Sequence, residues 1–486
     1  MRPENKNRTE ETRNTYAPGP KDPEKKPKAK VAVSAGSVKT KAPVSAGKTK
    51  AKTSAPAGKA KAKTSVSSDK TKAKTSAPAG KAKAKTSVSA DRMKTRSAAR
   101  KESVRIDKIR LLLPSPAVLL LGVWFLYALL NVLVPDRTVS ETEKRALAAF
   151  PEVSSDRIVS GDFSEDFETW ASAQLVGRNA LIRIRSTFGL LTGNRLSRDV
   201  YKSGDGYLIE RMADVDQKRL DRMLNAVNAF CARTQIPGTF VCAPNAVSVC
   251  SDLLPVSAIT EDQETWMQYI GNNLNGPVFC DLTGPLAEFY GSGRQAYYRS
   301  DHHWTTEAAF YTLPTVRAAL GLDTESSPMA PLAVCNDFVG SLAAKSGFSA
   351  SKKDTIFIYR SDAEPAYVVT DPAAQTKRAT VYSMDGLKSS DPYTVFLGGN
   401  TGHLNILTDN AEGEKLLVFK DSYFNCFLPF LLSDYREIDI IDPRYYYEDL
   451  DELILMGGYD RVLFFYDLNT LAEDTSLALV LGTEQG

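Results

Sequence analysis

The tetrapeptide Asp301-His302-His303-Trp304 holds two of the only three histidines in the chain. Histidine is the side chain best suited to move protons near neutral pH, and an aspartate beside it can fix the tautomer of the imidazole ring. In an extended segment, the side chains at i and i+2 share a face, so Asp301 and His303 are the candidate acid and base. We expect His302 to point the other way and, with Trp304, to have a structural role.

The same run of residues could instead bind a metal ion, because Asp-His-His offers two or three ligands and DHH phosphoesterases use such a run. In those enzymes, the run follows an apolar strand, and further aspartate motifs lie upstream. Here the residues AYYRS (296–300) precede it, and the sequence shows no partner cluster. We therefore expect no metal and no other cofactor.

A histidine base needs a nucleophile, and the best candidate is Ser422 in the sequence Lys-Asp-Ser-Tyr (420–423). An apolar run ends at Phe419, and the segment FNCFLPFLL (424–432) follows. Ser422 is therefore predicted on a strand-to-helix turn, where free N–H groups can stabilise a negatively charged oxygen. A base from residues 301–304 would activate the serine. The alternative is that Ser422 only caps the helix.

The elements that must position these residues are predicted to form an α/β sheet flanked by helices. Stretches with helical periodicity alternate with short apolar runs, which is typical of strands buried on both faces. In such sheets, ligands bind at the carboxyl ends of the strands. The predicted strands are 239–242, 415–419, 438–441 and 462–465, and the predicted helices are 214–231 and 424–432.

The charge of the chain is divided unevenly along its length. Residues 1–110 contain 31 Lys/Arg and 9 Asp/Glu, a net charge of +22, and the remaining residues have a net charge of −19. The stretch AKTSAPAGKAKAKTSVS occurs at 51–67 and again at 73–89. With almost no large apolar side chains, residues 1–110 are expected to be a disordered tail. Its lysines could also contact anionic lipid or nucleic acid.

Residues 111–134 contain no charged side chain and are long enough to span a bilayer. Lys108 and Arg110 precede this segment, so the positive-inside rule places the tail in the cytoplasm. Residues 135–486 are then an extracytoplasmic domain of a single-pass protein in the cell membrane. The alternatives are a cleaved signal peptide, disfavoured by the depth and length of the segment, and a buried core helix.

All six cysteines lie in this predicted outer domain. An even number outside the membrane is compatible with disulfides, but their irregular spacing matches no metal motif. Cys242 and Cys250 are the nearest pair in the sequence. Disulfides and free buried thiols remain alternatives.

These motifs together resemble the DHHW family and the alginate O-acetyltransferases of the AlgJ/AlgX type, which have an SGNH-hydrolase-like fold. The DHHW and KDSY blocks carry most of the resemblance, which extends over most of residues 136–486. The weaker blocks are SETEKRALAAFPE (140–152), SGDGYLIE (203–210), VCAPNAVSVCSDLLP (241–255) and FLGGN (396–400).

The resemblance implies a triad in which Asp301 is the acid, His303 the base and Ser422 the nucleophile. The order Asp-His before Ser is the permuted order of that subgroup. The turn at 398–400 is expected near the site, with Gly399 and Asn400 as candidates for oxyanion or substrate binding. His302 stands where the alginate proteins have threonine.

The resemblance also implies a function. It indicates a membrane-anchored, extracytoplasmic serine O-acyltransferase or acetylesterase that acts on a cell-surface polysaccharide or exopolysaccharide. Transfer would need an acetyl donor, which a separate membrane-bound acyltransferase could deliver. The alternative, from another class, is a noncatalytic surface protein that binds or assembles carbohydrate with the same fold.

Overall fold

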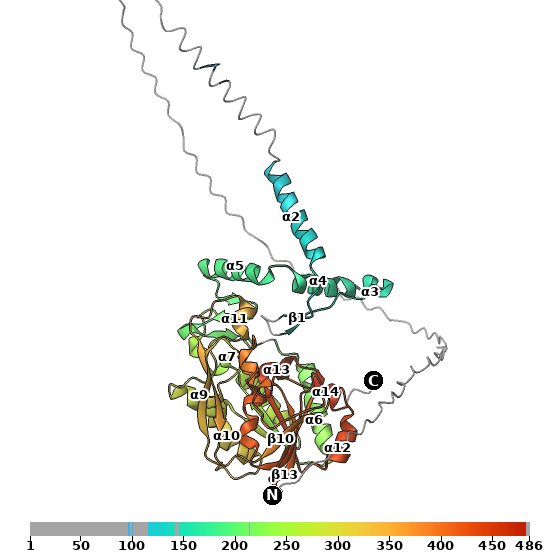
Figure 1. The fold of residues 1–486 in the computed structure, drawn as a ribbon, viewed down its shortest axis with the longest axis vertical. Helices are drawn as coiled ribbons and strands as arrows, with labels where there is room; N and C mark the ends of the chain where they lie inside the picture. The colour runs from blue at the N-terminus through green and yellow to red at the C-terminus, as the bar shows by residue number, and fades with distance from the viewer. Residues whose placement is uncertain (1–95, 98–99, 101–114, 141–144, 213, 483–486) are drawn as a thin grey trace, which may run out of the picture. The chain divides into compact units, whose positions relative to one another are not determined.

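The computed structural model describes residues 96–97, 100, 115–140, 145–212 and 214–482. The chain divides into two units, residues 1–95 and residues 96–486, and every element described below belongs to the second (Figure 1). The predicted disordered tail, residues 1–110, lies almost entirely outside the described residues. The predicted domain boundaries therefore stay predictions.

The centre of the second unit is an eight-stranded sheet in the order β11-β10-β12-β14-β13-β15-β6-β7. Strands β14, β13, β15, β6 and β7 are parallel to one another, whereas β12, β10 and β11 extend the sheet in antiparallel fashion. The strands of this sheet are β6 Gly238–Ala243, β7 Val278–Asp281, β10 Tyr367–Asp371, β11 Thr376–Arg378, β12 His403–Thr408, β13 Glu414–Lys420, β14 Tyr435–Ile441 and β15 Arg461–Asp467.

Smaller strands and a series of helices surround this sheet. The smaller strands are β1 Val139–Ser140, β2 Arg145–Ala146, β3 Leu196–Ser197, β4 Val200–Lys202, β5 Leu208–Glu210, β8 Ala330–Phe338 and β9 Asp354–Arg360. The α-helices are α2 Pro116–Leu133, α3 Ser155–Ser160, α4 Asp162–Gln174, α5 Arg178–Leu191, α6 Gln217–Thr234, α7 Ala246–Val249, α8 Gln263–Asn273, α9 Thr283–Gly291, α10 Thr306–Ala319, α11 Ser341–Ser346, α12 Leu450–Gly457, α13 Leu468–Glu473 and α14 Ser476–Val480. The 3₁₀ turns are η1 Gly204–Gly206, η2 Ser251–Leu253, η3 Gly386–Lys388, η4 Pro392–Val395, η5 Ser422–Cys426 and η6 Leu428–Leu431.

The α/β architecture predicted from the sequence is confirmed. The four predicted strands correspond to β6, β13, β14 and β15, which lie side by side. The predicted helix at 214–231 is α6, whose first turn is capped by the side chain of Asp216. The prediction of a helix at 424–432 is wrong, because this segment forms the 3₁₀ turns η5 and η6. Pro429 has no N–H group, so it could not donate the hydrogen bond to Asn425 that a continuous α-helix needs.

Both faces of the sheet are covered, as the apolar strands require. Adjacent residues of a strand point to opposite faces. In β15, the ring of Phe464 lies 6.0 Å from Phe230 of α6, between centroids. The next ring, Phe465, lies 5.9 Å from Trp304 and 5.1 Å from Phe427. Helix α6 therefore covers one face, and the DHHW segment packs with η5 and η6 on the other.

Helix α2 matches the predicted membrane span. Its 18 residues correspond to about 27 Å, and it is long and apolar enough to cross a bilayer. Ser115 caps its N-terminus, and Pro116 occupies the first turn, where its missing N–H group costs little. None of its residues is buried within the protein, so α2 is not a core helix.

The six cysteines are free thiols. Five of them are buried, and Cys335 is partly exposed. Burial raises the pKa of Cys250 and of Cys280 to about 12, so these thiols stay protonated at neutral pH. Of the two alternatives left open by the sequence, the structure has the free thiols.

The third histidine, His403, sits in a buried ionic cluster that ties the antiparallel part of the sheet to the loop before α12. Its Nε2 lies 2.8 Å from Asp439 Oδ1, and its Nδ1 lies 3.3 Å from Glu448 Oε2. Tyr459 and Asn405 also donate to Asp439, at 2.9 and 3.1 Å. With an acceptor at each ring nitrogen, His403 is arranged as an imidazolium. Burial opposes the charge, but the two carboxylates raise the pKa of His403 above its usual value.

Replacing His403 with Gln should therefore destabilise the protein in a pH-dependent way. A raised pKa in the folded state contributes stability that is fully present below the unfolded value of about 6.5 and is lost as the pH rises through the folded value. We expect a loss of about 1.5 kcal/mol or more at pH 5 and a smaller loss at alkaline pH. Denaturant unfolding of wild type and H403Q from pH 5 to pH 9 measures this loss. A difference in the free energy of unfolding that does not change with pH would show that His403 is not an imidazolium in the folded protein.

Candidate active site

The structure brings Asp301, His303 and Ser422 together in one hydrogen-bonded chain. The Nδ1 of His303 lies 2.5 Å from Asp301 Oδ1, and its Nε2 lies 2.7 Å from Ser422 Oγ. Asp301 and His303 are buried, whereas Ser422 is partly exposed. The order carboxylate, imidazole, hydroxyl is the arrangement in which a histidine can take a proton from a serine while the aspartate orients the ring.

The carboxylate of Asp301 is held by two elements. Its Oδ1 accepts from the backbone N–H of His303 at 3.1 Å as well as from the His303 ring. Its Oδ2 accepts from the N–H and the hydroxyl of Ser341, at 2.8 and 3.0 Å. Ser341 is the first residue of α11, and Gly340 precedes it. A Cβ atom at Gly340 would overlap the Asp301 carboxyl group, so the close approach of this helix end requires glycine.

Residues 301–303 form a bend rather than the extended segment predicted from the sequence. The hydrogen bond from the His303 N–H to the Asp301 carboxylate closes this bend and places both side chains on the same side. The expectation that His302 points away is wrong. Its ring lies 3.9 Å from the His303 ring, between centroids, and its Nδ1 lies 3.1 Å from Ser341 Oγ. The bend brings adjacent rings together, which an extended strand would have separated.

Ser422 stands at the carboxyl end of β13 and begins the 3₁₀ turn η5. The residue that caps this turn is Asp421, whose Oδ1 accepts from the N–H of Tyr423 at 2.8 Å. The alternative in which Ser422 is the cap is therefore wrong. Asp421 Oδ2 also accepts from the N–H of Asp467 at 2.6 Å, which ties the turn to the end of β15. Burial and the neighbouring Asp467 raise the pKa of Asp421.

Trp304 and Tyr423 lock the two sequence blocks to each other. The indole N–H of Trp304 donates to the carbonyl of Tyr423 at 3.1 Å. In return, the Tyr423 hydroxyl donates to the carbonyl of His302 at 2.5 Å and accepts from Asn245 at 3.1 Å. All of these bonds are buried or partly buried, where a lost partner is costly. The pair of bonds fixes the distance between the base and the serine.

Tyr393 covers the face of the His303 ring that lies away from His302. The two rings are stacked, with centroids 3.8 Å apart and planes inclined by 13°. The Tyr393 hydroxyl donates to the carbonyl of Ser422 at 3.3 Å. His303 is therefore held between Tyr393 and His302, which restricts its rotation and excludes water. Burial lowers the pKa of His303 to about 4; His302 adds to this effect, and Asp301 opposes it.

The turn at 398–400 reaches the vicinity of the serine through Asn400. The Asn400 Oδ1 accepts from Lys420 Nζ and from Asn425 Nδ2, both at 3.0 Å, and these residues lie on either side of Ser422 in the sequence. With its oxygen turned toward Lys420 and Asn425, the Asn400 side chain directs its amide N–H groups away from these two residues. The N–H of Gly399 is donated to the carbonyl of Phe396 at 3.2 Å, within the turn. Gly399, with a φ of +107°, therefore shapes the turn.

Asp301, His302 and His303 have ligand atoms within 4.8 Å of one another, close enough to surround a metal ion. Both nitrogens of His303 are already engaged, one by Asp301 and the other by Ser422. The Nδ1 of His302 lies against Ser341. A metal would have to break these hydrogen bonds, so the arrangement fits acid–base chemistry better than metal binding.

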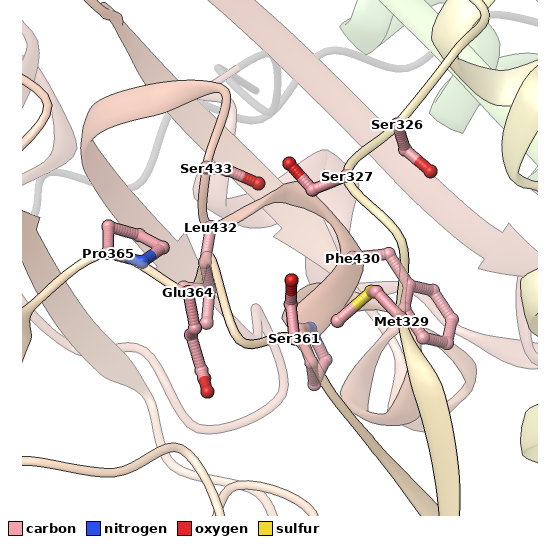
Figure 2. A pocket seen from close by; sticks show the side chains of 10 residues that line it. Ser326, Ser327, Met329, Ser361, Glu364, Pro365, Phe430, Leu432 and Ser433 are labelled. Carbon is pink, nitrogen blue, oxygen red and sulfur yellow. The ribbon is translucent and has the colours of Figure 1, made fainter.

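A small hollow is lined by residues other than the triad (Figure 2). It has room for about one water molecule, at 10 Å³. The lining residues are Ser326, Ser327, Met329, Ser361, Glu364, Pro365, Pro429, Phe430, Leu432 and Ser433.

Residues 256–441, which include the tetrapeptide at 301–304, match the sequence model of the family described as DHHW protein. This region of the chain is therefore similar in sequence to the DHHW family. The resemblance stated from the sequence is thus confirmed. A comparison with curated proteins finds no significant match.

Several solved structures are similar to this chain. A DHHW family protein from Eubacterium siraeum DSM 15702 has 20% identity and a TM-score of 0.50, over 58% of this chain and 95% of that one. PatB1 of Bacillus cereus, solved with a sulfonyl adduct, has 17% identity and a TM-score of 0.47, over 57% and 96%. The O-acetyltransferase domain of Pseudomonas putida AlgJ has 13% identity and a TM-score of 0.37, over 58% and 94%. The first similarity is one of fold alone. The TM-scores of the other two structures are too low to support any further conclusion.

Several residues of the site had not been predicted. Asn245 follows β6 and Asp467 is the last residue of β15, so the rule that polar residues at the carboxyl ends of parallel strands form the site would have found them. Tyr393 and the pair Gly340-Ser341 carry no such signal, because nothing local in the sequence connects them with Asp301 or His303. They reach the site only through packing.

Replacing Gly340 with Ala should displace the Asp301 carboxylate and lower the reactivity of Ser422. A misplacement of about 1 Å costs on the order of 100-fold in rate. The measurement is the rate at which a fluorophosphonate labels Ser422. Gly284→Ala is the matched control, because a Cβ there meets no atom within 4 Å. Equal labelling of G340A and G284A would show that the approach of α11 does not position the triad.

The labelling rate of Ser422 should also stay high well into the acid range. His303 acts as a base only when neutral, so the rate should fall as the pH drops through about 4, rather than through the usual histidine value. His302→Gln removes one cause of the lowering and should move this acid limb to higher pH. A midpoint between pH 6 and 7 in the wild type, on the order of an unperturbed histidine, would contradict the effect of burial.

Proposed function

We propose that this protein is a serine O-acyltransferase or acetylesterase that acts on a cell-surface polysaccharide or exopolysaccharide. The observation that carries the proposal is the continuous chain from Asp301 through His303 to the Ser422 hydroxyl, at 2.5 and 2.7 Å.

The proposed reaction has two steps. His303 takes the proton of Ser422 as the Ser422 oxygen attacks the carbonyl carbon of an acetyl ester. The tetrahedral intermediate collapses, the ester bond breaks, and the alcohol leaves with the proton from His303. A sugar hydroxyl or water then attacks the acetyl-serine by the reverse sequence of proton transfers. The backbone N–H of Ser422 and the Asn400 amide are the proposed donors to the oxyanion.

Transfer rather than hydrolysis requires that water be kept from the acetyl-serine. One feature of the site supports this: the ring of His303 is enclosed between the rings of Tyr393 and His302, whereas Ser422 and His302 are partly exposed. We propose that a separate membrane-bound acyltransferase supplies the acetyl donor.

The proposed location is the outer face of the cell membrane, with α2 as a single span, the basic tail in the cytoplasm and residues 135–486 outside. The length and apolar composition of α2 support the span. The cationic residues before it support the orientation. Contact of the tail with anionic lipid or nucleic acid remains part of the proposal.

The deciding experiment measures acetyl-ester hydrolysis and acetyl transfer to an oligosaccharide by the purified full chain. Ser422→Ala should lower both rates by a factor on the order of 10⁴ or more, because the nucleophile is lost. Ser433→Ala, at an exposed serine, is the matched control and should leave them unchanged.

Mass spectrometry of the wild type should find the acetyl group on the peptide that contains Ser422. Equal rates in wild type and S422A would show that Ser422 is not the nucleophile. No turnover in any form, with an intact fold, would favour the noncatalytic carbohydrate-binding protein.

A further inference from the structure

Helix α5 exposes an apolar stripe that the domain does not cover. The stripe consists of Leu181, Ile184, Phe188 and Leu191, whose exposed fractions are 47, 66, 67 and 81%. Their spacing of three, four and three residues places them on one face of the helix. Four large apolar side chains in a row on one helix face indicate a binding surface.

The other face of α5 is packed against the domain, so the stripe points outward. Ser186 is buried, and its hydroxyl lies 2.5 Å from the carbonyl of Ser346 and 3.0 Å from Ser197 Oγ. Ile182 packs directly against Gly347. At 100° per residue, Ile182 and Ser186 lie on the side of the helix opposite to the stripe.

The start of α5 is fastened to the last turns of α2. The Tyr127 hydroxyl donates to the carbonyl of Val176 at 2.7 Å, and the Val176 N–H donates to Asn131 Oδ1 at 2.8 Å. Val176 belongs to the turn between α4 and α5, which Figure 1 shows beside the end of α2. Tyr127 lies six residues before the end of α2, about 9 Å along its axis. This is the depth at which the apolar face of an interfacial helix is buried, about 5–10 Å.

The surroundings of the stripe fit a lipid–water boundary. The exposed cations Arg183 and Arg185 lie on its two sides, within reach of lipid phosphates. Next to it, α4 carries an aromatic cluster, in which Phe167 and Trp170 have ring centroids 5.4 Å apart. The Trp170 indole N–H donates to Asp136, which follows α2, at 2.8 Å. Aromatic rings with one polar end concentrate at this level of a membrane.

We propose that the face of α5 formed by Leu181, Ile184, Phe188 and Leu191 lies in the boundary between headgroups and acyl chains of the bilayer that α2 enters. The inference depends on the proposed span. It adds more than an anchor, because a second contact with the bilayer, made by α5, fixes the orientation of the domain on the membrane. The same helix packs on α11, whose first residue holds Asp301, so the membrane contact also fixes the position of the site relative to the bilayer.

The test introduces the photoreactive residue p-benzoylphenylalanine into the full chain, reconstituted in vesicles of phosphatidylcholine and phosphatidylglycerol. It replaces Phe188 or Leu191 in the stripe, Leu126 in α2, or Met456 in α12. Met456 is the matched control, because it is an apolar residue as exposed as Leu191, at 79%, but belongs to a different helix. Unchanged thermal unfolding of each variant verifies the fold.

We expect lipid adducts from positions 188, 191 and 126, and no lipid adduct from position 456. Adducts at 126 but none at 188 and 191 would overturn the inference while leaving the span intact. Cross-links from 188 or 191 to a second copy of the chain or to another protein would also overturn it, as would equal lipid labelling at 456. Absence of an adduct at 126 would overturn both the span and the inference, without bearing on the chemistry of Ser422.

Discussion

The buried carboxylate of Asp301 is the group around which the site is built. With 2% of its surface exposed, it must find its hydrogen-bond donors inside the protein, since an unpaired buried charge is strongly destabilising. Two donors come from His303, and two come from Ser341 at the start of α11. Satisfying this one group therefore closes the bend at 301–303, requires glycine at 340 and aims the His303 ring at the serine.

The other half of the site depends on the parallel strands. Strands β13, β15 and β6 end at the same edge of the sheet, so the residues that follow them meet although they are far apart in the chain. Asp421 holds the turn of Ser422 against the end of β15, and Asn245 after β6 holds Tyr423. The hydrogen bond between His303 and Ser422 then joins residues that are 119 positions apart. The end of β13 positions Ser422 and the hydrogen-bonded bend at 301–303 positions His303, so both partners are held as precise proton transfer requires.

Helix α11 contacts both the candidate active site and helix α5. Its first residue holds Asp301, and its last residues pack on α5. Under the proposed arrangement, a short helix of six residues connects the membrane-facing side of the domain with the catalytic carboxylate. In the proposed function, a membrane-bound donor supplies the acyl group, and a constant distance between the site and the bilayer would assist that transfer.

Much of this protein was determined by local features of the sequence. The apolar runs specified β6, β13, β14 and β15, because strands buried on both faces need uninterrupted apolar side chains. The uncharged segment at 111–134 predicted the apolar helix α2, and the motifs Asp-His-His-Trp and Lys-Asp-Ser-Tyr pointed to the three residues that form the hydrogen-bonded chain. Only the tertiary structure decided the orientation of His302, the 3₁₀ turns after Ser422, the role of Asp421 as the cap, and the contributions of Gly340, Ser341 and Tyr393. The physical reason is that these depend on which buried groups find partners across the fold, and such long-range pairing leaves no periodic trace in the chain.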